Sequence, residues 1–125
     1  MAATFHNDIF DMGLSQLTTI VENLYICSAM PTTFAEASST YKLGTKASPT
    51  ITGPADRTGG GREVTVAAIT DGVVNADGTA GFYALCDNSA SKLLVAQALS
   101  ATQVVTSGNP FSLAALKVGM PDPTA

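Results

Sequence analysis

The residue types that most often carry catalysis are few in this chain and widely spaced. His6 is the only histidine and lies close to the N-terminus, where a side chain is hard to hold rigidly, so we expect a surface or helix-entry role for it. Cys27 and Cys86 are the only cysteines and are far apart in the sequence, which does not match the ligand spacing of a structural zinc site. These residues therefore predict neither a catalytic centre nor a metal site.

The aspartates lie at positions that are typical of turns. Asp71 and Asp77 each precede a glycine, and Asp87 opens a polar loop, which are positions where Asp supports a turn. Their spacing differs from that of a calcium-binding loop. The glutamates stand alone in the sequence, and the chain has no Gly-x-Ser-x-Gly elbow for a nucleophilic serine: Glu22, Glu36, Glu63. We expect no catalytic residues and no enzyme activity.

A glycine-rich stretch at residues 53–61 invites comparison with a phosphate-binding loop. The stretch lacks a Gly-Lys-Ser/Thr ending, and residues 62–69 have the pattern of a strand where a P-loop requires a helix. We therefore interpret residues 53–61 as an exposed loop and expect no nucleotide or other cofactor.

Composition and charge exclude two classes of partner. The 125 residues include six Lys and Arg against ten Asp and Glu, and the basic residues form no run, so neither nucleic acid nor a membrane surface is an expected partner. Only 13% of the residues are charged, while 46% are hydrophobic. A surface so poor in charge is typical of a protein that packs against neighbours in an assembly.

The two cysteines lie in apolar, strand-like runs, where cysteine usually behaves as a small buried hydrophobic residue. A disulfide between Cys27 and Cys86 would need a Cα separation of about 5.5 Å. The sequence leaves that pairing open.

One helix is predicted, over residues 7–18. Asn7 or Asp8 can cap it, and its apolar residues have helical spacing: Ile9, Phe10, Met12, Leu14, Leu17. A helix this short is marginal alone. It must dock on the sheet or on a neighbouring subunit, and we favour the sheet.

The remainder of the chain reads as strands. Strand patterns cover residues 19–28, 42–52 with a break at Pro49, and 62–69, and residues 32–38 connect two of them as a helical turn or a loop. Two Asp-Gly pairs around Val73–Ala76 predict a hairpin. Three further strand-like runs in residues 79–118 predict consecutive antiparallel strands at the centre of the fold.

These patterns predict a mainly β fold: an antiparallel β-sandwich or flattened barrel of about seven strands with one short N-terminal helix. At 125 residues the chain is expected to form a single domain, 1–125, with residues 1–18 as an N-terminal helical arm and 119–125 as an extended C-terminal tail. The two prolines of the tail suit an extended segment that lies on a neighbour.

Apolar residues at both ends of the chain are the candidate interface with other subunits. They are Phe5, Ile9, Phe10, Met12, Met120 and Pro121. The N-terminus lacks the basic region and the apolar core of a signal peptide, so we expect synthesis in a cytoplasm.

Several short stretches together resemble small virion proteins of tailed bacteriophages. They are spread over nearly the whole chain: 4–7, 26–28, 31–33, 35–37, 39–41, 53–56, 61–62, 65–66, 84–87, 93–94 and 106–109. The resemblance lies in turns and strand ends and includes no catalytic signature. It implies a structural protein that is present in many copies in the virion after synthesis in the host cytoplasm.

Within that class we expect a capsid decoration or cement protein, a homo-oligomer whose partner is the major capsid protein. A neck, tail or tail-fibre-associated protein is the alternative, in which case the partner is a tail or neck protein. A soluble enzyme or inhibitor made during infection is a third class.

Overall fold

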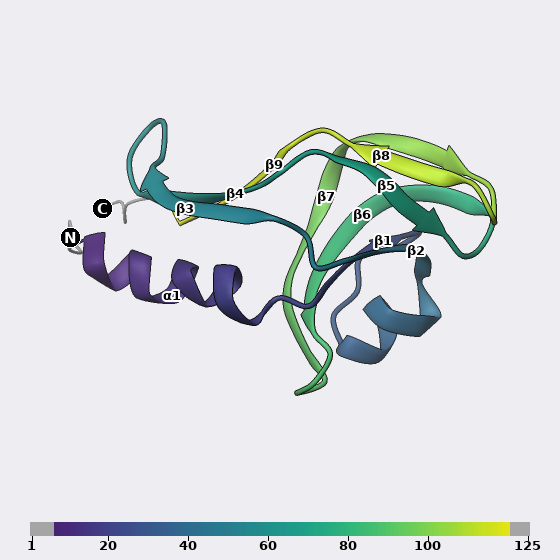
Figure 1. Cartoon of the computed structure of the whole chain (residues 1–125), viewed down its shortest axis with the longest axis horizontal. Coiled ribbons are helices and arrows are strands. Elements are labelled where there is room, and N and C mark those ends of the chain that lie inside the picture. Colours follow the sequence, from purple (N-terminus) through teal and green to yellow (C-terminus); the bar gives the residue numbers. More distant parts are fainter. Residues whose placement is uncertain (1–6, 121–125) are drawn as a thin grey trace. The chain divides into compact units, whose positions relative to one another are not determined.

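The computed structural model describes residues 7–120, whose course is drawn in Figure 1. They form a mainly β fold with antiparallel sheets and a short N-terminal helix, which confirms the predicted fold class. In chain order the elements are α1 (Asn7–Ile20), β1 (Asn23–Cys27), η1 (Glu36–Thr40), β2 (Lys42–Ala47), β3 (Ile51–Asp56), β4 (Arg62–Val66), β5 (Ile69–Val74), β6 (Gly78–Asp87), β7 (Lys92–Val105), β8 (Pro110–Leu113) and β9 (Leu116–Met120).

The described residues fall into two compact units whose segments alternate along the chain. The first unit takes residues 7–20, 50–68 and 114–120, and the second takes 21–49 and 69–113. The chain therefore passes between the units several times. β9 includes Gly119 and Met120, two residues that the sequence assigned to the tail.

The first unit is α1 on a three-stranded sheet of order β3-β4-β9. The helix contacts β3 and β4, which confirms the prediction that it docks on the sheet. Leu14 and Leu17 are buried. Met12 is 71% exposed, so its predicted place on the buried stripe is wrong: it lies two residues before Leu14, on a different side of a helix with 3.6 residues per turn.

The glycine-rich stretch is shorter as a loop than the sequence predicted. Residues 53–56 belong to β3, and the chain turns only at 57–61 to enter β4. The Arg57 N–H donates to the Gly61 carbonyl at 3.0 Å, closing the turn. Gly59, Gly60 and Gly61 all have a positive φ, a conformation that other residues adopt with strain.

The second unit is a six-stranded sheet of order β7-β6-β1-β2-β5-β8. β1 and β2 occupy its centre, and Leu24, Ile26 and Cys27 of β1 are fully buried. The prediction that residues 79–118 form the centre is wrong. β6 and β7 do pair with each other, but β8 lies at the opposite edge and β9 belongs to the other sheet, because apolar sequence alone does not specify strand order.

The predicted hairpin around Val73–Ala76 is also wrong. Asp71 and Gly72 lie inside β5, which pairs with β2 and β8 rather than with β6. A Cβ on Gly72 would lie 2.3 Å from the Phe111 ring of β8, so this glycine permits a close approach of the ring to the strand. The need for space, and not for a turn, explains the glycine after Asp71.

The six-stranded sheet curls so that its two edge strands meet at one end. Gln103 Nε2 of β7 donates to the Ser112 carbonyl of β8 at 2.8 Å. The β6–β7 register shifts between Ala80 and Phe82, where β7 has extra residues, and such a bulge bends a strand. Only the final part of β7 reaches β8.

The segment before β2 covers one face of this sheet. Ala37 of η1 is buried in a cluster with Tyr25, Cys27, Ala84 and Cys86. The Glu36 N–H donates to Thr33 Oγ1 at 3.1 Å. The sequence left residues 32–38 as either a helical turn or a loop. Residues 34–40 are helical, so the first alternative is correct.

Candidate functional site

The sequence-predicted interface residues belong to the first unit so far as the structure describes them. Ile9 and Phe10 lie on α1 and Met120 ends β9, and for these three only the backbone is described. Met12 is exposed to solvent. Phe5 and Pro121 lie outside residues 7–120. The interface role of all six stays a prediction.

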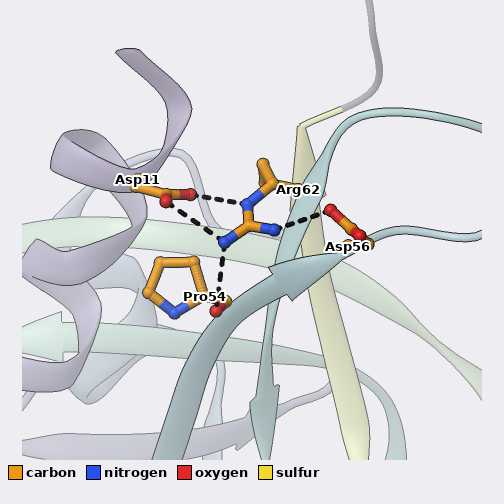
Figure 2. A network of polar contacts seen from close by, with 4 residues as sticks. All are labelled: Asp11, Pro54, Asp56 and Arg62. Atoms are coloured by element: carbon orange, nitrogen blue, oxygen red, sulfur yellow. Dashed lines mark hydrogen bonds and ion pairs between the residues drawn. The ribbon is translucent and has the colours of Figure 1, made fainter. Parts of the chain in front are cut away.

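An arginine network fixes α1 to its sheet (Figure 2). The Arg62 guanidinium of β4 donates through Nε to Asp11 Oδ1 at 2.8 Å and through Nη2 to Asp11 Oδ2 at 3.2 Å. Nη1 donates to Asp56 Oδ1 at 2.7 Å, and Nη2 also reaches the Pro54 carbonyl at 3.4 Å. One side chain thus joins the helix to both strands of the β3–β4 hairpin.

The two carboxylates of this network are in different surroundings. The Asp11 side chain is 29% exposed and the Asp56 side chain is 87% exposed. Hydrogen bonds to Asp11 and then to Asp56 raise the pKa of Arg62 above its usual value, so the guanidinium remains charged. The guanidinium binds both carboxylates and the Pro54 carbonyl, so the polar groups of this network are used within it. This indicates a structural role, in which the network sets the position of the helix on its sheet.

The two cysteines do not form a disulfide. In the β1–β6 register Cys86 lies opposite Asn23, four residues from Cys27, which corresponds to roughly 13 Å along a strand. Burial raises the pKa of Cys27 to about 12, with a smaller contribution from Cys86, and burial raises the pKa of Cys86 to about 11. Both thiols are protonated at neutral pH, so they lack the thiolate that nucleophilic chemistry needs.

The carboxylates hold loops and strands in place. The Ser89 N–H donates to Glu22 Oε1 at 2.7 Å, and this bond is the main cause of the lowered pKa of Glu22. The Ser107 N–H donates to Asp77 Oδ1 at 2.7 Å, and Lys46 Nζ lies 3.0 Å from Asp71 Oδ1. Within the part of the chain that the structure describes, no three His, Cys, Asp or Glu side chains come together as metal ligands would.

A shallow, open depression lies over the β5–β8 pair. Its volume is about 390 Å³, and its lining is mostly apolar: Thr70, Asp71, Gly72, Val73, Gly108, Asn109, Pro110. Its single titratable group, Asp71, is already paired with Lys46. The depression adds exposed apolar surface, to which Val73 contributes at 55% exposure.

The sequence did not predict that β7 is an edge strand of the second unit. β7 has β6 on one side and no second strand beside it within residues 7–120. Over Lys92–Ala98 it carries one charge, at Lys92, and its side chains are half-buried or exposed. The run of apolar residues signalled a strand, but a central strand and a neutral edge strand have the same pattern.

None of the helices within residues 7–120 combines the length and the apolar character that a bilayer crossing requires. No protein-family model, curated protein or solved structure matches this chain.

Proposed function

We propose that this chain is a non-enzymatic structural protein of a tailed-bacteriophage virion, and specifically a decoration or cement protein that binds the assembled capsid lattice. Its partner is the major capsid protein. The proposal starts from the sequence resemblance described above. One observation carries it: the residues of that resemblance make contacts that shape the fold.

Four of the resembling stretches illustrate this role. Pro54 and Asp56 accept hydrogen bonds from Arg62, which lies in a second such stretch. Glu36 Oε1 accepts hydrogen bonds from the backbone N–H of Thr32 at 2.8 Å and from its hydroxyl at 2.9 Å. These contacts determine backbone geometry, which is what a protein selected for shape requires.

The turn at 106–109 follows the same rule. The Asn109 N–H donates to the Thr106 carbonyl at 3.1 Å, and Gly108 has a φ of 90°. The turn joins β7 to β8, the two edges of the curled sheet. The hydrogen bond and the glycine stabilise the reversal of the chain between the two strands. This supports a structural function for these residues.

The described surface suits lateral contact. Four large apolar side chains are exposed, Met12, Met30, Val73 and Val104, the last of them at 85%. With only 13% charged residues in the chain, little charge has to be stripped of water when such a surface is covered. A cement protein that binds the assembled lattice, and not free subunits, stabilises the shell by mass action.

The copy number in purified virions tests the proposal. A decoration protein is expected in amounts comparable to the major capsid protein, which quantitative gel densitometry or mass spectrometry of the particles would show. A few copies to a few dozen would contradict decoration and support the neck or tail alternative. Absence from the particle would overturn the virion assignment altogether and support the third class.

A further inference from the structure

We propose that the free edge of β7, residues 92–98, pairs antiparallel with the same segment of a second copy of the chain. The pairing would extend the six-stranded sheet across a two-fold axis. It concerns the isolated protein and is independent of the proposed virion role.

The first argument is that this edge lacks the protections of the other sheet edges. β8 is four residues long, begins at Pro110, and receives the Gln103 hydrogen bond. β3 contains Pro54, which has no N–H to offer, and β9 has Lys117 in its middle. Natural proteins use such devices to prevent edge pairing. After Lys92, β7 has no proline, glycine or charge up to Val105.

The second argument concerns which part of β7 is regular. Val95–Ala98 lie in uninterrupted register with β6, opposite Leu85–Phe82. A one-residue bulge precedes this run, and a longer bulge follows it and turns the strand toward β8. The regular run therefore forms the centre of the pairing, with the half-buried side chains of Leu93, Leu94 and Leu99 beside it.

The third argument identifies the strand that pairs with the β7 edge. The edge requires a partner strand that is both long and nearly free of charge. Among the described edges, β3 contains Asp56, β9 contains Lys117, and the uncharged β8 is only four residues long, so β7 itself meets both conditions. A two-fold axis places one residue opposite its own copy, and if that residue is Ala96, the two Lys92 side chains stand roughly 26 Å apart at ~3.3 Å per residue, well beyond the Debye length. If β7 paired with a different edge of the next copy, each copy would still have a free edge and the assembly would keep growing. Antiparallel pairing of β7 with itself uses the same edge of both copies and gives a closed dimer.

Sedimentation velocity of the purified chain over a concentration series tests the proposal. We expect reversible formation of a species of twice the 12.7 kDa chain mass, with a dissociation constant of about 10–100 μM because the contact is small. Ala98 is exposed at the end of the regular run. Ala98→Lys should weaken association at least tenfold, since a lysine on an edge strand opposes pairing with another strand.

Two matched variants control for other effects of this change. Ala98→Thr enlarges the same side chain without charge and should leave association unchanged. Ser112→Lys adds the same charge at an exposed position on the opposite edge and should also leave it unchanged. Circular dichroism checks that each variant is folded.

Hydrogen exchange supplies a measurement that needs no variant. The amides of residues 95–98 should become more protected as the concentration of the unmodified protein rises, while those of β8 should not. A chain that remains monomeric throughout the series would overturn the proposal. So would a dimer that persists in Ala98→Lys, because its interface would lie elsewhere.

Discussion

At the scale of single residues, Arg62 shows how one side chain can position an element. It binds both oxygens of Asp11 and one of Asp56, yet the two aspartates differ greatly in exposure. An exposed ion pair contributes little to stability because water and salt screen it. The shielded bidentate pair with Asp11 should therefore account for most of the stabilisation.

We predict that Asp11→Asn lowers the melting temperature by several degrees, because an amide faces the guanidinium with one donor group instead of a second acceptor. Asp56→Asn is the matched change at the exposed partner and should have little effect. Thermal unfolding followed by circular dichroism measures both. Equal losses for the two variants would contradict the assignment of Asp11 as the main anchor.

The buried cysteines predict a loss of stability at alkaline pH. The folded pKa values of Cys27 and Cys86, about 12 and about 11, lie above the ordinary value of 9.0, so the folded state keeps protons that the unfolded state releases. The contribution of the two thiols to the free energy of unfolding is complete below pH 9 and is lost as the pH rises towards 11–12.

Urea unfolding at a series of pH values measures this effect, and Cys27→Ala should give a shallower fall of the unfolding free energy above pH 9. Tyr83, whose pKa burial raises to about 12, continues to titrate in that variant and accounts for part of the remaining slope. Rapid reaction of both thiols with a disulfide reagent in the native protein at neutral pH would show that they are not buried.

At the scale of elements, the contact between β5 and the Phe111 ring of β8 shapes the curled sheet. We predict that Gly72→Ala destabilises the protein by about 1–3 kcal/mol, since the new Cβ would overlap the Phe111 ring. In Gly81→Ala the nearest atom would be Thr102 Cγ2 at 3.6 Å, and the change should stay within about 0.5 kcal/mol. Urea denaturation compares the two; a neutral Gly72→Ala would mean that the ring can move aside.

The elements also show where sequence reasoning succeeds. The break at Pro49, the start of a strand at Arg62 and the pairing of β6 with β7 were predictable, because proline, glycine and short polar turns act over a few residues. The end of that strand was not: it was predicted over residues 62–69, but β4 ends at Val66 and Ile69 begins β5 of the other sheet. The hairpin predicted at Asp71–Gly72 was also wrong. The same dipeptide suits a tight turn and a flat strand position, and only the Phe111 ring, far along the chain, distinguishes them.

At the scale of the whole molecule, the virion and dimer proposals can fail separately. The copy number depends on contacts with the shell, whereas sedimentation of the purified chain depends on the β7 edge alone. A monomer present in many copies per particle would leave decoration standing and exclude the pairing of β7.

The sequence by itself determined the class of fold, the positions of most strands and the scarcity of charge, since these follow from local propensity and composition. Only the tertiary structure decided that β1 and β2 lie at the centre, that Arg62 meets Asp11, that the cysteines are too far apart to bond, and that β7 is left as a free edge. Strand order depends on contacts between residues distant in the chain, and a run of apolar residues is compatible with many partners.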